Sequence, residues 1–528
     1  MSSTATSTPA PAELSRISRL IILDGLCSHV LGVLTTGAIL VGFALHLGAS
    51  NAVIGVISGI PFLAQMLQIP AVYVVNRMGH RRALVVGAGL IGRTFWLTLA
   101  TIPWVVPEPW RVHALIALMV SFFSLNALVN CAWSSWMRDL VPDRSMGALF
   151  GRRMSIGTAL AALLSLAAGY SIDRFTSLFA HPLAIYSVLF LLGGSFGLLG
   201  LLFLWRTPER PMQPVGGESM LRLLSAPLRD TNYRNLLVFL GVWSVAANLA
   251  APFFTVYMLK QLQMSMTWVL AFSVVSQAVT VVFYRIWGRL SDRYTNKSVL
   301  GVAGFLFILT FLMWPFTTMP EKHSLTIPLL IFIHVVAGIG TAGVTLCTGN
   351  IALRAAPFGR ATAYLAVNAL ITGFAATTAP VLAGSAADWL GQYQLQFDVR
   401  WISTTSPSDL VTLHALNLGG FDFLFIFAFI VGLYAMHRLL AVREEGEVKE
   451  RVVLYELFME VRRIALHVSN ITGLRHFGYF PYILLRQRAR PSARKGEDAD
   501  DGRRSPIKSP EQELAEPAFE TKGRSCDS

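Results

Sequence analysis

The sequence predicts an all-α integral membrane protein with twelve transmembrane helices in two pseudo-symmetric six-helix bundles. Three observations predict this fold: the composition, the number of long apolar segments, and a repeat that relates the two halves. The 528 residues are 54% hydrophobic and 14% charged, with a mean hydropathy of +0.55. Such a composition lies outside the range of soluble globular domains. A polytopic membrane protein is therefore expected.

The apolar segments are long enough to cross a bilayer. A transmembrane helix needs about 20 apolar residues, because each backbone N–H and C=O must be paired within the segment. The segments of the first half are 19–47, 52–75, 83–106, 112–137, 154–175 and 182–205. Those of the second half are 235–259, 266–290, 299–319, 325–348, 362–386 and 416–441. The first segment exceeds the apolar region of a signal peptide, so it is expected to remain as a helix.

These segments divide the chain into five parts. They are the tail 1–18, the bundle 19–205, the linker 206–234, the bundle 235–442 and the tail 443–528. The second tail begins with a predicted amphipathic helix, whose apolar face includes Leu454, Leu457 and Val461. Such a helix is suited to lie on the membrane or under the bundle. A basic run over 486–495 suits anionic lipid headgroups, and the last 30 or so residues have the composition of a disordered segment.

The positions of the loop cations predict the orientation. Lys and Arg are retained on the cytoplasmic side of short loops, and most loop cations here follow even-numbered segments. The loops after odd-numbered segments hold only Arg111, Arg174, Lys260, Lys322 and Arg400. Both termini are therefore expected in the cytoplasm, and the excess of Arg over Lys suits a bacterial plasma (inner) membrane. The net charge of +13 then reflects topology, so no nucleic-acid partner is expected.

A repeat relates the two halves of the chain. Arg138 and Arg354, each at the exit of a fourth segment, are 216 positions apart. Asp173 and Asp388, each at the end of a fifth segment, are 215 apart. Because transporter folds are commonly built from internal repeats, this shared register predicts a duplicated six-helix unit.

Two charged loops carry a family resemblance. The spacing G-x-x-x-D-R-x-x-x-K resembles the cytoplasmic loop signature of the major facilitator superfamily, and it is formed by Gly288, Asp292, Arg293 and Lys297. A first-half copy consists of Asn76, Arg77, Gly79, Arg81 and Arg82. The resemblance covers residues 19–442 or so. It implies two six-helix bundles around a central cavity that opens alternately to each side, in a monomeric secondary-active or facilitative transporter.

The resemblance also implies a role for the loops as a cytoplasmic gate. By the family's pattern, Asp292 accepts hydrogen bonds from the start of the fifth helix, here residues 151–155, where the helix dipole favours an anion. In the first-half copy Asn76 replaces the acid, so the gate is expected to be asymmetric, with more coupling energy on the Asp292 side. The alternative is that the loops act only as topology anchors.

Polar side chains at helical spacing are candidates for the wall of the solute cavity. They recur at i, i+3, i+4 and i+7 on single faces of apolar segments. The candidates are Gln65, Gln68, Asn126, Asn130, Trp133, Ser273, Gln277, Tyr284, His334, Asn368 and Thr372. The alternative role is hydrogen bonding between helices. A cavity of this kind is short of acids and favours a neutral or amphipathic solute.

Ionisable groups inside the apolar segments are the candidates for ion coupling. Such groups are costly in a bilayer and are functional candidates by default. Asp24, Arg93 and His334 lie within the first, third and tenth segments. An imidazole titrates near neutral pH, so His334 is a candidate for a coupling proton or for a hydrogen-bonded packing role. Arg93 is expected either to pair with a neighbour or to bind an anion, and Asp24 either to titrate or to pair with a cation.

Several function classes lack their motifs. The sequence has no phosphate loop for ATP hydrolysis, no CxxC or His/Glu metal pattern and no nucleophile and base at catalytic spacing. No enzyme, cofactor or metal site is therefore predicted. The predicted function is transport of a small organic solute across the bilayer. The alternative is a membrane sensor of the same fold that signals through its C-terminal tail.

Overall fold

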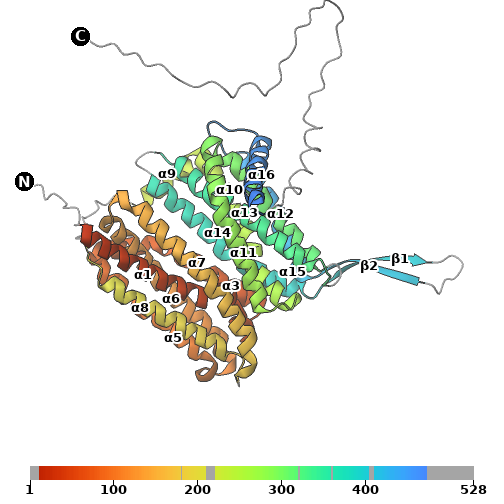
Figure 1. Ribbon diagram of the computed structural model, residues 1–528, viewed down its shortest axis with the longest axis horizontal. Coiled ribbons are helices and arrows are strands. Elements are labelled where there is room, and N and C mark those ends of the chain that lie inside the picture. The colour runs from red at the N-terminus through yellow and green to blue at the C-terminus, as the bar shows by residue number, and fades with distance from the viewer. Residues whose placement is uncertain are drawn as a thin grey trace, which may run out of the picture. The chain divides into compact units, whose positions relative to one another are not determined.

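The computed structural model describes residues 11–179, 181–209, 220–318, 322–357, 361–402 and 410–472. The first half of the chain forms α1 (Pro11–Thr35), α2 (Gly37–His46), α3 (Asn51–Met66), α4 (Gln68–Met78), α5 (Arg81–Val105), α6 (Glu108–Leu140), α7 (Asp143–Phe175) and α8 (Ala184–Trp205). The second half forms α10 (Thr231–Val256), α11 (Met266–Arg293), α12 (Asn296–Met313), α13 (Thr326–Arg354), α14 (Ala361–Leu390) and α15 (Gly420–Leu439). Figure 1 shows these two sets of helices side by side.

Short elements complete the fold. The predicted linker contains the helix α9 (Met220–Arg229), and the C-terminal tail begins with α16 (Glu450–Thr472). Between α14 and α15, the strands β1 (Leu395–Ile402) and β2 (Leu410–Leu418) pair antiparallel and extend away from the helices in Figure 1. The last predicted segment therefore starts as a strand, and its helix begins at Gly420.

The described residues hold eleven helical spans long and apolar enough to cross a membrane, one fewer than the sequence predicts. The difference is the predicted segment 52–75, which divides at Leu67 into α3 and α4. Pro70 explains the division, because it has no N–H to donate to the carbonyl of Met66 and its ring would collide with the preceding turn. Within α4, Pro70 lies in the first turn, where proline is tolerated. The count of twelve is thus approximate.

The first predicted segment is also divided. α1 ends at Thr35, and α2 begins at Gly37 with a backbone φ of +62°. Only glycine adopts such a left-handed conformation at little cost. The interruption therefore depends on Gly37.

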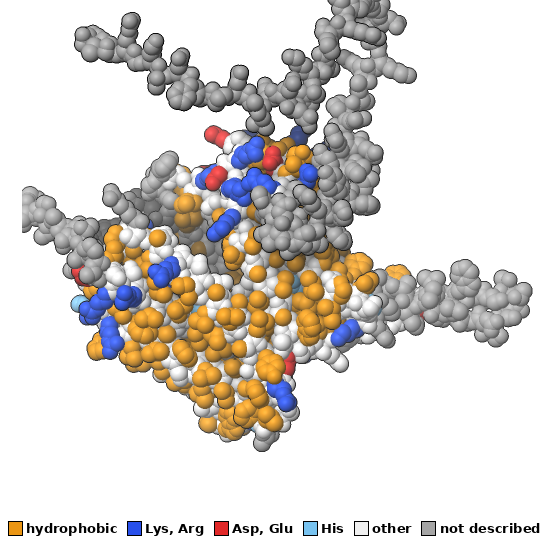
Figure 2. All heavy atoms as spheres, in the orientation of Figure 1, with side chains coloured by type: hydrophobic (Ala, Val, Ile, Leu, Met, Phe, Trp, Pro, Cys, Tyr) orange, Lys and Arg blue, Asp and Glu red, His pale blue; other side chains and the backbone are white. Residues whose placement is uncertain are grey.

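Apolar side chains cover much of the outside of the helices. Figure 2 shows hydrophobic side chains spread over the face in view. Leu163, Leu382 and Phe374 are each more than 60% exposed. Exposed apolar surface on this scale is typical of helices that face lipid. The chain is a multi-pass membrane protein.

The two halves pack closely at one end. α3 lies along α14, and α7 lies along α11. A Cβ added at Gly55 of α3 would overlap the backbone carbonyl of Pro380, and one added at Gly384 of α14 would overlap that of Asn51. Small residues let the helix backbones approach, as is common in membrane proteins. We call this end, which also carries Asp173 and Asp388, the Asp388 end, and the opposite end the Asp292 end.

The chain divides into two compact units. The first ends at Glu460 and contains all the helices from α1 to α15, and the second begins at Val461 within α16.

Candidate solute cavity and gates

A cavity of about 570 Å³ lies between the two halves. Its wall includes the interruption between α1 and α2, with Thr36 and Gly37, and two predicted residues of α11, Ser273 and Gln277. Asn248 of α10 adds an amide. Interrupted helices at the interface of two repeats are the usual setting of a transporter's binding site.

A second cavity of about 360 Å³ adjoins the first within the first half. The two share Gly32, Thr36 and Phe123 in their walls. Three of the predicted residues line this second cavity: Asn126, Asn130 and Trp133 of α6. We call it the side cavity.

The side cavity contains a cluster of three charges. Asp24 of α1 is 2% exposed. Its Oδ1 lies 3.9 Å from Nη2 of Arg93 on α5, and its Oδ2 lies 3.7 Å from Nη2 of Arg153 on α7. Arg93 also donates a hydrogen bond to the carbonyl of Gly197 on α8. The guanidinium of Arg153 lies 5.0 Å from the ring centroid of Trp133, as in a cation–π contact.

The helices build this cluster through spacing and through small residues. One face of α1 lines the side cavity from Asp24 to the end of the helix at Thr35. Residues three, four or seven positions apart in a helix project on the same side. That face consists of Asp24, Ser28, Leu31, Gly32 and Thr35. On α8, a Cβ at Gly200 would lie 3.1 Å from Arg93 Nη1 and 3.2 Å from Asp24 Oδ1. Glycine at this position leaves room for the ion pair.

The remaining predicted cavity residues lie elsewhere. Gln65, Gln68 and Tyr284 are exposed, and the Thr372 hydroxyl donates to the carbonyl of Asn368 at 2.8 Å. The described residues that line the two cavities therefore do not include Gln65, Gln68, Tyr284, Asn368 or Thr372.

His334 is packed inside the second half. It is 9% exposed, and its Nδ1 bonds to the carbonyl of Leu330 at 2.8 Å. Its ring stacks on Phe272 at a centroid distance of 5.1 Å and meets Trp314 edge-on at 5.8 Å. This is the packing arrangement that the sequence left open beside proton coupling.

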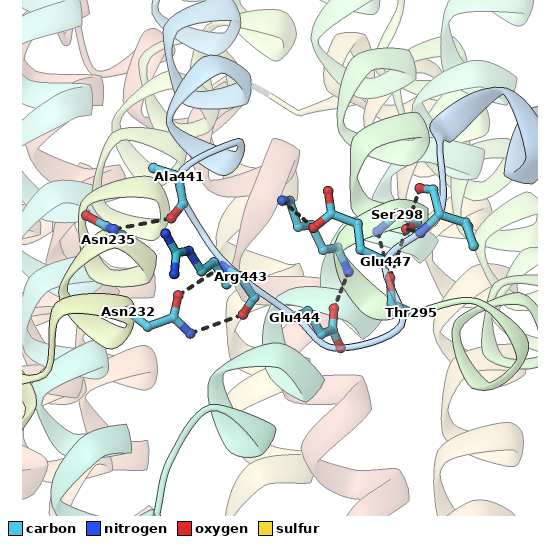
Figure 3. Close-up of polar contacts among 10 residues, drawn as sticks. Asn232, Asn235, Thr295, Ser298, Ala441, Arg443, Glu444 and Glu447 are labelled. Carbon is cyan, nitrogen blue, oxygen red and sulfur yellow. Dashed lines mark hydrogen bonds and ion pairs between the residues drawn. The ribbon is translucent and has the colours of Figure 1, made fainter.

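The second-half charged loop is covered by the chain that follows α15. Residues 441–448, which we call the strap, cross the starts of α10 and α12 (Figure 3). Glu444 accepts hydrogen bonds from the Lys297 backbone N–H at 2.7 Å and from the Asn296 amide at 3.0 Å. Glu447 pairs with Lys297 Nζ at 2.7 Å. Asn232 of α10 exchanges two hydrogen bonds with the backbone of Arg443.

The other cations of this loop meet carboxylates as well. Arg293 Nη1 lies 3.6 Å from Glu456 of α16. Asp292 is 80% exposed and lies 3.9 Å from Arg354 Nη2. The predicted docking site for Asp292 at residues 151–155 is not a helix start, because α7 begins at Asp143. A Cβ at Gly151 would meet nothing within 4 Å. In this conformation Asp292 therefore pairs within its own half, and there is open space at Gly151.

The first-half charged loop has a different buried anchor. Arg81 has no exposed surface, and its Nη1 bonds to Asp139 Oδ2 at 2.5 Å and to the Ser135 carbonyl at 2.9 Å. Its backbone N–H donates to Glu209 at 2.6 Å. Gly79 ends α4 with a φ of +65°. The remaining members of the loop are Arg77 and Arg82, which are exposed, and Asn76, whose side chain lies outside the described part.

At the Asp388 end, two aspartates cap helices of the opposite half. Asp388 of α14 accepts from the N–H groups of Asn51 and Ala52 at 3.1 and 2.8 Å. Asp173 of α7 accepts from those of Met266 and Thr267 at 2.9 and 2.7 Å. A carboxylate at a helix N-terminus satisfies free N–H groups and is favoured by the helix dipole. The sequence singles out both residues as repeat landmarks, without this role.

Arg153 is the functional candidate that the sequence analysis missed. The predicted fifth segment begins at 154, which leaves Arg153 in the preceding loop, whereas α7 begins at Asp143. The available signal was Gly25, beside Asp24 on α1, because a Cβ at that position would overlap the Arg153 side chain. No group of three His, Cys, Asp or Glu side chains in the described ranges is arranged to hold a metal ion.

Comparison with protein families and solved structures identifies the fold. The chain is similar to the nucleoside transporter NupG, with 13% identity over 81% of this chain and 98% of that one, and a TM-score of 0.58. It is similar to a bacterial homologue of the human lysosomal transporter Spinster in an inward-facing, unoccupied conformation. The identity is 14% over 85% of this chain and 99% of that one, and the TM-score is 0.56. It is also similar to a D-xylose–proton symporter, with 14% identity over 83% of this chain and 98% of that one, and a TM-score of 0.55.

At these identities the similarity shows the fold alone, and comparison with curated protein sequences gives no match. The family model of the Major Facilitator Superfamily matches residues 25–380 and, in an overlapping second match, 238–461. The chain is a membrane transporter by fold and family, and it belongs to the Major Facilitator Superfamily.

Proposed function

We propose that this chain carries a small organic solute across a plasma membrane by alternating access, with both termini in the cytoplasm. The observation that carries the proposal is the 570 Å³ cavity between two halves that are latched at the Asp388 end. Asp173 and Asp388 hold that end closed, while Asp292 is exposed at the other end. The solute then enters from the Asp292 end in this conformation.

The reverse conformation requires an exchange of contacts between the ends. Asp173 and Asp388 release the helix starts that they cap, and the halves rock about the cavity. Asp292 leaves Arg354 and approaches α7 near residues 151–155, which lie inside that helix because α7 begins at Asp143. A charge at a helix N-terminus contributes about 0.3–2 kcal/mol, so release of the two caps costs only a small free energy. A solute that binds one conformation more tightly shifts this equilibrium.

Flux into proteoliposomes tests the proposal. A panel of sugars, amino acids, carboxylates, nucleosides and amphiphilic drugs is first screened for ligands that raise the unfolding midpoint, and the hits are used as labelled solutes. Gly32 lines both cavities, and a Cβ there meets nothing within 4 Å, as is also true of Gly87 on α5. Gly32→Phe should fill the cavity and abolish flux, and the matched variant Gly87→Phe should transport. Equal flux in both variants would contradict the assignment of the cavity.

Removal of the second unit separates a transporter from a sensor. The truncation should begin at residue 461, because the strap and Glu456 belong to the first unit and contact its helices. Flux should survive deletion of residues 461–528. A chain that binds a ligand from the panel but shows no flux, with or without those residues, would favour the sensor.

A further inference from the structure

We propose that the side cavity binds the carboxylate of a small amphipathic organic monoanion, which the charged cluster Asp24–Arg93–Arg153 recognises. The proposal deepens the proposed function by naming a substrate class, and it rests on that function for the claim that the ligand is transported. The binding itself is tested independently of transport.

The first argument is the unbalanced charge of the cluster. The ionisable residues that line the side cavity, as far as the structure describes the chain, are Asp24, Arg93 and Arg153. One carboxylate faces two guanidinium groups, so the formal charge of the cluster is +1. A charge held inside a membrane protein is costly unless it is paired. A ligand with one negative charge makes the cluster neutral, whereas a neutral or cationic ligand leaves the charge uncompensated.

The second argument is the free donor capacity of Arg153. A guanidinium has five N–H donors in a fork that matches a carboxylate. The distance from Arg153 Nη2 to Asp24 is 3.7 Å, longer than a hydrogen bond, and its Nε has no hydrogen-bond partner among the described residues. Arg93, by contrast, donates to the Gly197 carbonyl. Arg153 therefore supplies the donors, and Arg93, whose Nη2 lies 3.9 Å from Asp24, adds the second positive charge.

The third argument is the composition of the rest of the wall. Phe122, Phe123 and Trp133 give the side cavity an aromatic surface, and Asn126 and Asn130 add two amides one turn apart on α6. Phe123 also lines the larger central cavity. A ligand with its carboxylate at Arg153 therefore has an apolar surface for its body, continuous with the cavity between the halves. The proposed ligand is an amphipathic anion, whereas the scarcity of acids in the sequence was equally compatible with a neutral solute.

Binding of model carboxylates to the full-length protein in detergent tests the proposal. The probes are benzoate and 3-phenylpropanoate, with the uncharged amides of both acids, and inorganic phosphate as a small anion without an apolar body. Isothermal titration and the unfolding midpoint give the affinity. We expect the two carboxylates to bind and to raise the midpoint, and the amides and phosphate to bind at least tenfold more weakly. Equal binding of acid and amide, or no binding of either acid, would overturn the proposal.

Three variants separate recognition from a structural role. Arg153→Gln should weaken carboxylate binding by tenfold or more, since it removes the charge-assisted hydrogen bonds to the ligand. The neighbouring Arg152 is exposed, and Arg152→Gln should leave the affinity unchanged. Asp24→Asn raises the charge of the cluster from +1 to +2 and should tighten binding. If Arg153→Gln leaves the affinity unchanged, or if Asp24→Asn weakens it as a purely structural ion pair would, the proposal is wrong.

Binding and flux can fail separately. If carboxylates bind with the expected variant effects but show no flux in liposomes, the binding site is supported and the transport function is contradicted. If a neutral solute is transported but carboxylates do not bind, the transport function is supported and the carboxylate site is contradicted.

Discussion

Arg81 is a guanidinium with no exposed surface at the start of α5. Asp139 at the end of α6 is 46% exposed and lies 2.5 Å away, so the ion pair joins two helices at the Asp292 end. The carboxylate retains part of its hydration, whereas the guanidinium has lost its own. The pair is therefore more important for Arg81 than for Asp139.

Removal of the Asp139 charge should destabilise the protein. Asp139→Asn removes the charge of a carboxylate that lies 2.5 Å from the buried guanidinium, and breaking a buried pair from one side costs about 3 kcal/mol. The measurement is the apparent unfolding midpoint in detergent at a fixed scan rate. Glu108→Gln is the matched control, because Glu108 is 84% exposed and its pair with Arg111 is expected to contribute little. A midpoint for Asp139→Asn equal to that of the control would contradict the role given to Arg81.

The charged cluster shows which single residues a sequence can identify. Asp24 and Arg93 are recognisable because ionisable groups inside an apolar segment are costly, and the structure brings them together. Arg153 was not recognised, because it follows Arg152 at the predicted edge of a segment. Only the true start of α7 at Asp143 places Arg153 three turns inside the helix. The contacts of Glu444 and Glu447 depend on a chain reversal after α15 that has no periodic signal.

At the scale of elements, each half ends in a carboxylate that caps its third transmembrane helix. Glu209 follows α8 and accepts from the first N–H of α5, at Arg81. Glu444 follows α15 and accepts from the N–H of Lys297 in α12. Lys297 is 216 positions after Arg81, in register with the other repeat landmarks. The strap is thus part of the folded second half.

Loss of the Glu444 cap should loosen the start of α12. Glu444→Ala removes the acceptor of the Lys297 N–H, and loss of a helix cap typically costs about 1 kcal/mol. Hydrogen exchange should become faster in the first turn of α12 and in the strap. Glu445→Ala, at an exposed neighbouring position, is the control and should exchange as the wild type does. Unchanged exchange in Glu444→Ala would show that the cap is dispensable.

The contact of α3 with α14 should be sensitive to one methyl group. A Cβ at Gly55 overlaps the carbonyl of Pro380, so Gly55→Ala should force the Asp388 end apart and shift the conformational equilibrium by about tenfold or more. Spin labels at Leu178 and Tyr393, both exposed and in opposite halves, report the separation. Gly87→Ala adds the same methyl group where space is open and should leave the distances unchanged. Identical distances in the two variants would contradict tight packing at Gly55.

The sequence predicts the elements better than their interruptions. Apolar length locates nearly every span, because a bilayer requires it. The division at Leu67 was predictable in principle from Pro70, but the surrounding apolar residues concealed it. The interruption at Thr36 depends on the left-handed φ of Gly37, which a glycine permits but does not require. The β1–β2 hairpin was also predictable in principle, because apolar and polar residues alternate from Leu395 to Trp401.

At the scale of the whole molecule, the repeat places related charged residues at both ends of the two halves. The landmarks that the sequence reveals fall into two groups in space. Asp173 and Asp388 join the halves at one end, whereas Asp292 pairs within its own half at the other. Duplication is visible in a sequence, but which contacts are formed at a given moment is a property of the conformation, and no residue pattern specifies it.

Alternating access is tested by paired distances, one at each end of the molecule. Spin labels are placed at Leu178 and Tyr393 for the Asp388 end, or at Met78 and Leu353 for the Asp292 end, all of them exposed positions, in a background that lacks the native cysteines. Asp173→Asn with Asp388→Asn removes the charge from both caps at the Asp388 end. The double variant should lengthen the first distance and shorten the second in the same fraction of molecules. Opening of one end without closure of the other would contradict alternating access.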